Sequence, residues 1–427
     1  MQQDKPDAEL LDTIENFLRT IIAGLKDETG SRLGRPRVLP ALALWTGMLV
    51  CVARGFSSQL DLWRLLAHTG LWDYPRFALE DDAVYKRLKQ APRGALHRIF
   101  EIVTEVLLRR REEGNSQTGG LADWASGVFA LDEMTLDAVK KRLPSLRQVA
   151  EAVLPGKVTA LFDVRAQLWR QVLFHEDAQQ NEKVAARDML AYLPPGSLLL
   201  ADLGYFAFAW FDDLTRLGYH WISRLRAKTS YTVLYVLYRD DSVLDAIVWL
   251  GAYRADRAGQ AVRLVSYTRQ GKTWSYLTNV LDPARLPILL IGQLYARRWD
   301  IEMMFNMVKT HLHLHVLWSS HLAVVMHQVF AVFTVAQVIL GLRSEIAQRA
   351  NADVFEVSLD LLIRWLPRFA QNGEDPVQAL VERGRDMLII RPSSRLVVRA
   401  PDPPLHLYAP LPPDIVLTRT PRYAMKA

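Results

Sequence analysis

Four polar residues between positions 295 and 309 combine an acid with cations at a spacing that would place them on one helix face. They are Tyr295, Arg298, Glu302 and Lys309, and on one continuous helix they would project within about 60° of arc. A glutamate held among cations can bind a metal ion while its neighbours contact phosphate. A solvated surface helix uses similar Arg–Glu and Glu–Lys pairs, so the helix face alone leaves both interpretations open.

An apolar face beside this polar one predicts the helix that must carry it. Six residues share that face: Leu294, Ile301, Met304, Phe305, Val308 and Leu312. Arg297 does not fit the division and would have to reach past its apolar neighbours.

Two aspartates upstream lie in or after apolar runs of the kind that form buried strands. Asp132 lies in the strand-like run 127–137, and Asp202 ends the uninterrupted apolar run that begins after Ser197. A polar linker at 112–120 precedes both, and there the pattern changes from helices to strands. The sequence therefore predicts that a new domain starts after the linker.

The spacing Tyr-x2-Arg-x3-Glu-x6-Lys resembles the signature of DDE transposases of the insertion-sequence-4 type. Members of that family place a first Asp on the first strand of an RNase H-like fold, commonly followed closely by Thr, as in Asp132 and Thr135. The second family Asp ends a later strand, often before a Gly-Tyr pair, as Asp202 does here. The resemblance covers about residues 122–345 and implies that Asp132, Asp202 and Glu302 are the catalytic residues.

One position departs from the family pattern. Glu133 follows Asp132 where small residues are common, so Glu133 or Asp137 could be mistaken for the true ligand. Asp132 is our prediction because it follows the apolar run directly.

Three clustered carboxylates suit a pair of divalent ions, since these ions prefer hard oxygen ligands and can activate water and stabilise charge on both reacting oxygens. Mg²⁺ is the expected ion, with Mn²⁺ as an acceptable substitute. The resemblance implies that Asp132 holds both ions, while Asp202 and Glu302 each complete one coordination shell.

The resemblance also implies double-stranded DNA as partner, namely transposon inverted repeats and a target. Tyr295, Arg298 and Lys309 would contact the transposon end near the cut. Some relatives stack a flipped base on a Trp of the β insertion, which makes Trp274 the candidate and Trp249 the reserve. Aromatic residues at strand spacing are more often sheet core, and this alternative stays open. Because two ends must be handled together, we expect a homodimer on DNA.

The expected fold class is α/β, with an RNase H-like catalytic core interrupted by a β-rich insertion and preceded by an all-α N-terminal DNA-binding region. Periodicity and composition predict five regions: helical 1–115, core 122–212, β insertion 213–284, core with the signature helix 285–372, and a basic Pro-rich tail 373–427.

Composition narrows the class of protein. The 427 residues are 50% hydrophobic with a net charge of +6, which permits an anionic partner. A lone Cys51 closes no intramolecular disulfide and builds no thiolate zinc site, so we expect a reducing, cytoplasmic setting. The acidic start, MQQDKPDAELLD, does not resemble an export signal. The apolar run 322–342 is long enough to cross a membrane, but His327, Gln328 and Gln337 interrupt it, which favours a buried core helix.

Two further alternatives remain at this stage. The stretch 84–111 is strongly basic, and charge alone does not distinguish a phosphate-contacting surface from a solvated helix face. A non-catalytic regulator derived from a transposase conflicts with the presence of all three acids. A metal-dependent nuclease that never joins strands is not separated from a transposase by sequence.

Overall fold

The protein is built on one large mixed sheet. The computed structural model describes residues 13–26, 38–113, 121–136, 156–177, 182–252, 256–393 and 398–423. The described strands are β1 (Val128–Thr135), β2 (Lys157–Asp163), β3 (Leu168–His175), β4 (Leu198–Ala201), β5 (His220–Arg224), β6 (Tyr231–Arg239), β7 (Val243–Leu250), β8 (Val262–Arg269) and β9 (Lys272–Thr278). They form a nine-stranded sheet in the order β3-β2-β1-β4-β5-β9-β8-β7-β6.

The two halves of the sheet differ in strand direction. β1, β2 and β3 are antiparallel, whereas β4 lies parallel to β1 and β5 parallel to β4. β6 to β9 are antiparallel and join the first half through the pairing of β9 with β5. The segment 213–284, predicted as a β insertion, therefore extends the core sheet instead of forming a sheet of its own.

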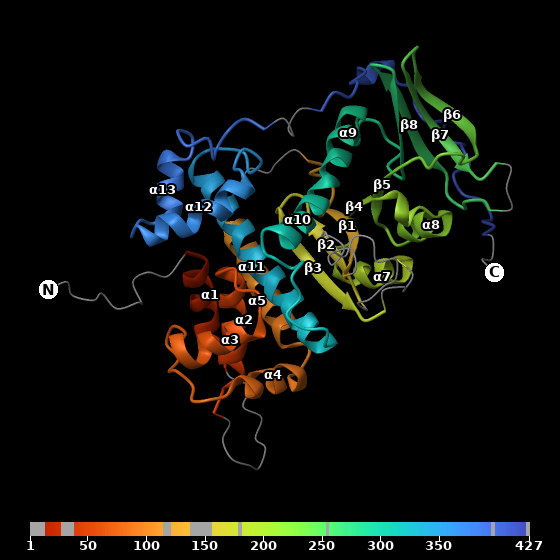
Figure 1. The fold of residues 1–427 in the computed structure, drawn as a ribbon. Helices are drawn as coiled ribbons and strands as arrows, with labels where there is room; N and C mark the ends of the chain where they lie inside the picture. Colours follow the sequence, from red (N-terminus) through yellow and green to blue (C-terminus); the bar gives the residue numbers. More distant parts are fainter. Residues whose placement is uncertain are drawn as a thin grey trace.

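Helices cover the sheet and form a separate body at one end of the molecule (Figure 1). They are α1 (Thr13–Ala23), α2 (Ala41–Ala53), α3 (Gln59–Arg64), α4 (Asp81–Gln90), α5 (Ala95–Glu113), α7 (Glu182–Met189), α8 (Phe208–Arg216), α9 (Ile288–Arg297), α10 (Trp299–Thr310), α11 (Leu322–Arg349), α12 (Leu359–Gln371) and α13 (Pro376–Arg383). Short π- or 3₁₀-helical turns lie at Leu65–Thr69, Leu190–Tyr192, Leu203–Tyr205 and Leu405–Leu407. In the helical body, α2, α5 and α13 all pack on α11, so helices that precede and follow the sheet strands in the sequence share one core.

The C-terminal residues 398–423 pack along the antiparallel half of the sheet. The Ala409 amide donates to the Leu237 carbonyl at 2.8 Å, and the Ala261 amide donates to the Leu417 carbonyl at 2.8 Å. Arg419 Nη2 donates to a carbonyl of β7 at 2.7 Å. The tail sequence shows no hydrophobic periodicity. Its apolar side chains pack against the strands and do not form a core of their own.

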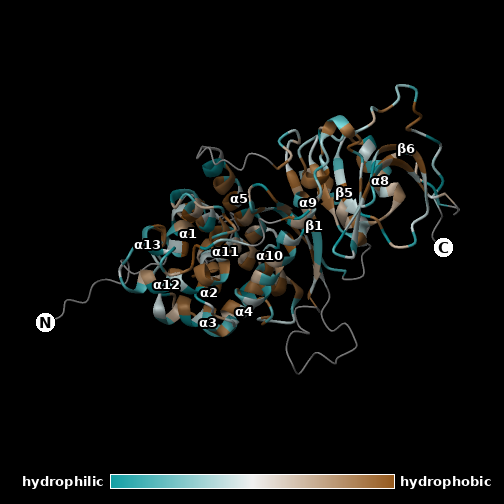
Figure 2. Cartoon of the chain, turned by 90° about the horizontal axis from the view of Figure 1, so that it is seen from above, coloured by the Kyte–Doolittle hydropathy of each residue, from teal (hydrophilic) through white to brown (hydrophobic). Residues whose placement is uncertain are grey.

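The predicted core helix at 322–342 is confirmed as part of α11, which runs through the helical body and is coloured mainly hydrophobic in Figure 2. Within the described part of the chain, α11 is the one helix long and apolar enough to cross a membrane. However, 89% of its most apolar stretch is buried inside the fold. Its apolar surface is thus covered by the protein's own helices and sheet.

Polar residues of α11 connect it to neighbouring elements. Gln337 accepts from the Trp169 amide at 3.0 Å and donates to the Trp169 carbonyl at 2.8 Å and to Thr104 Oγ1 at 2.9 Å. Gln328 accepts from the Trp318 amide at 3.0 Å. The polar interruptions of the apolar run therefore satisfy backbone groups that would otherwise be buried without partners.

We expect Gln337→Leu to lower the free energy of unfolding by about 2–4 kcal/mol, because both backbone groups of Trp169 lose buried hydrogen bonds. Urea denaturation measures the change. Gln348→Leu, the same substitution at an exposed position of α11, should cost less than about 0.5 kcal/mol. Equal losses in the two variants would contradict a linking role for Gln337.

Candidate active site

Asp132, within β1, and Asp202, directly after β4, lie level with each other on adjacent parallel strands. β1 and β4 pair with Ala130 opposite Leu200, and each aspartate lies two residues further along the chain. Since side chains alternate along a strand, both aspartates project from the face on which Ala130 and Leu200 join the core under α10 and α11. The strand register therefore brings together two acids that are 70 residues apart in the sequence (202 − 132).

Glu133 projects from the opposite face of the sheet. Lys157 Nζ lies 2.7 Å from Glu133 Oε2, and Thr159 Oγ1 donates to Oε1 at 2.9 Å. The Lys157 and Glu133 side chains are only 2% and 9% exposed. This buried ion pair engages Glu133 away from Asp132, which favours Asp132 as the site residue. The other alternative, Asp137, lies outside the described residues.

Helix α10 brings Glu302 close to Asp132 and Asp202. α10 packs on β1, and Asp300 in its first turn accepts a hydrogen bond from Gln167 Nε2 at 2.8 Å. Further along, the Phe305 ring lies 5.2 Å from the Trp169 ring of β3. These contacts fix α10 against the sheet and thereby set the position of Glu302.

The prediction of one continuous helix across 295–309 is wrong. α9 ends at Arg297 and α10 begins at Trp299, with Arg298 between them. The physical reason is a tightened turn, in which the Arg298 amide bonds to the Tyr295 carbonyl three residues back at 3.2 Å. The apolar face is nevertheless buried as predicted, at Leu294, Ile301, Met304, Phe305, Val308 and Leu312.

Arg298 lies among the carboxylates. Its Nη2 is 2.7 Å from Glu302 Oε1, and its Nε is 3.7 Å from Asp202 Oδ1. The Arg298 side chain is only 6% exposed, whereas Asp202 and Glu302 are 40% and 32% exposed. Among the described residues, Arg298 Nε and Nη1 have no hydrogen-bond partner. Arg298 thus holds two acids from different elements together and keeps donors for a further acceptor.

The pKa values show that all three acids belong to one electrostatic cluster. Burial raises the pKa of Asp132 to about 6, and the charges of Glu302 and Asp202 add to the rise, while the Glu133 amide and Arg298 oppose it. Burial by itself lowers the pKa of Arg298, but Asp202 and Glu302 outweigh burial and the pKa is raised. Three carboxylates around one guanidinium leave negative charge that a cation can neutralise.

The carboxylate cluster suits hard divalent cations, although its side chains do not form a complete set of metal ligands. Across the described ranges, no three His, Cys, Asp or Glu side chains stand in a ready-made metal-binding arrangement. Burial is the main cause of the raised pKa of Asp132, and the neighbouring carboxylates Glu302 and Asp202 add to it. Carboxylate oxygens are the ligands that Mg²⁺ and Mn²⁺ prefer. The residues present therefore fit such ions chemically.

The other predicted DNA contacts lie at different depths. Tyr295 is buried, its hydroxyl donates to the Ala201 carbonyl at 3.5 Å, and burial raises its pKa to about 12. The ring of Tyr295 on α9 thus lies against the sheet, beside Ala201 of β4 and 5.2 Å from the Tyr276 ring of β9, and not on an open surface. Lys309 and Trp274 are half-buried, and the reserve candidate Trp249 lies in the core of the antiparallel half.

A pocket of about 730 Å³ adjoins this cluster and contains residues that the sequence did not single out. Trp274 and Tyr295 line it together with Trp299, whose side chain is 57% exposed. Arg224 and Arg399 also line the pocket. Sequence reasoning could have found Trp299, because it follows Arg298 of the signature directly. No local sequence pattern connects Arg399 to a helix residue 100 positions earlier (399 − 299).

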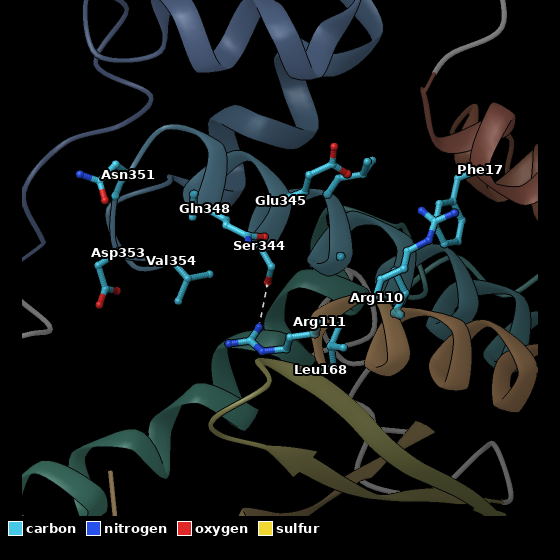
Figure 3. Close-up of a pocket in the computed structure, with 15 residues that line it drawn as sticks. Phe17, Arg110, Arg111, Leu168, Ser344, Glu345, Gln348, Asn351, Asp353 and Val354 are labelled. Carbon is cyan, nitrogen blue, oxygen red and sulfur yellow. Dashed lines mark hydrogen bonds between the residues drawn. The ribbon is translucent and has the colours of Figure 1, made fainter. Parts of the chain in front are cut away.

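A larger cavity, about 850 Å³, lies between α1, α5 and α11, and none of the three acids lines it (Figure 3). Arg110 lies over the Phe17 ring at 4.7 Å, and Arg111 Nη1 donates to Ser344 Oγ at 3.4 Å. Other cations of the basic stretch 84–111 pair with acids: Lys86 with Asp82, Arg93 with Glu176, and Arg109 with Glu105. These contacts within the fold favour a solvated helix face over a phosphate-contacting surface.

The pKa of Asp132 predicts a pH dependence of stability. Because its pKa rises from 3.8 to about 6 on folding, the folded state binds more protons between these values, and stability is lost as pH rises from about 4 to about 6. Over this pH interval, the free energy of unfolding of Asp132→Asn should rise relative to that of the native chain by up to about 3 kcal/mol. Urea denaturation of both proteins in chelator at several pH values measures the difference, and parallel stability profiles would contradict the burial of this carboxyl.

Three comparisons relate parts of this chain to known proteins. Residues 145–337 match the transposase DDE domain family, a range that includes Asp202 and Glu302 and begins after Asp132. Transposase InsG for insertion sequence element IS4 of Escherichia coli (strain K12) is 26% identical over 140 residues, and the match spans 31% of this chain and 31% of that relative. A solved piggyBac transposase synaptic complex with hairpin DNA aligns over 91% of this chain and 84% of its own, with 10% identity and a TM-score of 0.40. Part of this chain is therefore similar to the transposase DDE domain family and to a transposase of the IS4 type.

Proposed function

We propose that this chain is a metal-dependent transposase that hydrolyses phosphodiesters at transposon ends and joins the exposed 3′-hydroxyl to target DNA. The observation that carries the proposal is the convergence of Asp132, Asp202 and Glu302 on Arg298. The acids come from β1, from the end of β4 and from α10, so the fold and not a local motif assembles them. The transposase DDE domain match supports this chemistry over other uses of three carboxylates.

We also propose that β1 to β5 and their helices form an RNase H-like core. Three placements support this: Asp132 lies on the first strand, Asp202 follows a later parallel strand, and Glu302 lies on a helix packed against β1. Strands β6 to β9 lie between the second and third acids, where the family carries its β insertion. The helical region 1–115 stays our candidate for further DNA contacts.

The three acids and Arg298 have different roles in this mechanism. Asp132, Asp202 and Glu302 would hold two Mg²⁺ or Mn²⁺ ions, which when bound supply an activated water and stabilise charge on the attacking and leaving oxygens. Asp202 and Glu302 are the more open acids and face the approaching strand, while Asp132 lies deeper. Arg298 fixes the relative positions of Asp202 and Glu302.

DNA contacts around the cut follow from the same geometry. Arg298 Nε and Nη1 would donate to a phosphate oxygen, since both are buried donors without a partner in the described residues. Lys309 at the far end of α10 would add a second phosphate contact, and Trp274 a stacking surface for a base. Tyr295, being buried, would act mainly by supporting Arg298 from below.

The partners follow from the reaction. We propose that the chain binds double-stranded transposon ends and target DNA as a homodimer in the cytoplasm, because two ends must be processed together. The nuclease alternative differs in one observable respect, since it would cut transposon ends without ever joining them to a target.

Glu302→Gln is expected to abolish cleavage while DNA binding is retained, because the amide keeps the side-chain shape but loses the charge that binds a divalent ion. Purified protein, a labelled duplex carrying the element's terminal repeat, target plasmid and Mg²⁺ are incubated, and nicked and joined products are resolved on gels. The loss should exceed about 100-fold. Glu345→Gln, an exposed glutamate of α11, serves as the matched control. Equal cutting by the Glu302 variant and the native chain would remove Glu302 from the site.

Arg298→Ala is expected to weaken end binding and to reduce the slope of log K against log salt by about one, as for one lost phosphate contact. Binding is measured by anisotropy between low and moderate salt without Mg²⁺. Arg364→Ala removes an exposed arginine that pairs with Asp360 and should leave the slope unchanged. If the Arg298 variant is folded and its salt slope is unchanged, Arg298 does not contact a phosphate and serves only to bind Asp202 and Glu302.

A further inference from the structure

The pocket of about 730 Å³ beside the acids is built from segments far apart in the sequence. Strands β5, β8 and β9 form one wall, and α9 and α10 form another. The third side is the C-terminal tail, through Val398 and Arg399. This tail segment lies beyond the range 145–337 that matches the DDE domain family.

The charge of the pocket is one-sided. Three arginines line it, Arg224, Arg269 and Arg399, and no aspartate or glutamate does. All three are exposed, and none forms an ion pair with a carboxylate in the described part of the chain. Other exposed arginines of this chain do pair with acids, such as Arg187 with Asp213. Three uncompensated cations around one hollow favour an anion there.

The pocket wall also offers flat apolar surface. The Trp274 and Tyr267 rings are stacked at 5.5 Å, and the Tyr276 ring lies 6.2 Å from Tyr267 and 5.2 Å from Tyr295. This row of rings leads from the β strands toward α9 and the turn at Arg298. Guanidinium groups beside stacked aromatic rings fit a nucleic-acid strand, which presents phosphates and bases together, better than a free inorganic anion.

The position of the tail is fixed by a glycine on α9. A Cβ atom at Gly292 would lie 2.9 Å from Ala400 Cβ and 3.2 Å from Val398 Cγ1. The tail therefore packs directly on the helix backbone, and Arg269 Nη1 lies 3.4 Å from the Arg399 carbonyl oxygen that it faces. Further along, Tyr423 hydroxyl donates to Asp212 Oδ2 at 2.7 Å, so contacts on the fold continue to the end of the described tail.

We propose that the C-terminal tail completes a strand-binding pocket next to the acids, in which Arg399 acts with Arg224 and Arg269 on the backbone phosphates of DNA. This rests on the proposed function, because it assigns the tail a part in holding the strand that the acids cut. Arg399 is a binding residue in this arrangement and takes no part in the chemistry. Gly292 is a positioning residue, since it admits the tail to the pocket wall.

The test compares Arg399→Ala with Arg391→Ala, which removes another exposed arginine of the C-terminal segment that does not line the pocket. Binding of the full-length proteins to a fluorescein-labelled oligothymidine of about 20 nucleotides is followed by anisotropy across a salt series. Arg399→Ala should weaken binding about three- to tenfold and reduce the salt slope by about 0.7, while Arg391→Ala stays within about twofold of the native chain. Gly292→Val should weaken binding similarly, because the added side chain displaces the tail.

Thermal melting of each variant establishes that the chain is folded before binding is compared. Native affinity and salt slope for folded Arg399→Ala would overturn the proposal, whatever the cleavage assay shows. Loss of binding in Arg399→Ala together with no metal-dependent cleavage by the native chain would leave the pocket standing and defeat the proposed transposase reaction. The two ideas therefore fail separately.

Discussion

The structure depends on one buried guanidinium that three carboxylates surround. Removing Arg298 from water is costly unless its charge is matched, and Asp202 and Glu302 match it across two separate elements. The same contacts limit repulsion among the acids, of which Asp132 is the most strongly affected by burial. Because the carboxylates outnumber the guanidinium, the cluster is stable only as a partly compensated site. In the proposed function, divalent ions would bind at this excess negative charge.

The rest of the fold keeps this cluster in position. Parallel pairing of β1 with β4 makes Asp132 and Asp202 neighbours, and strand alternation sends Glu133 to the opposite face, where Lys157 compensates it. Helix α10 is fixed on the sheet by the hydrogen bond between Gln167 and Asp300. Below it, the largely apolar α11 supplies a rigid support, and its glutamines satisfy the backbone groups that it covers.

Some of this arrangement follows from sequence and some does not. The apolar run before Asp202 and the buried face of the signature segment are set by local patterns, and both appear where the periodicity places them. The break at Arg298 was not predictable from spacing, because it depends on a side chain turning inward to partners from distant strands. The continuous sheet and the place of Arg399 depend on long-range pairing and on the small volume of Gly292, for which a single sequence carries no periodic signal. Tyr295 shows the same limit, since its burial results from contacts with Ala201 of β4 and Tyr276 of β9.

Two neighbouring regions of this surface carry opposite charge. The pocket walled by Trp274 and the tail carries three arginines and no acid, so under our proposal it would attract a DNA backbone whether or not ions are bound. The neighbouring acid cluster carries excess negative charge and repels a phosphate until cations compensate it. In the proposed function, a strand would therefore be held beside Glu302 before it is cut, and its entry over the acids would depend on divalent ions. The short path along the aromatic row from Trp274 to Tyr295 connects the two regions, which explains why the tail returns to this edge of the sheet.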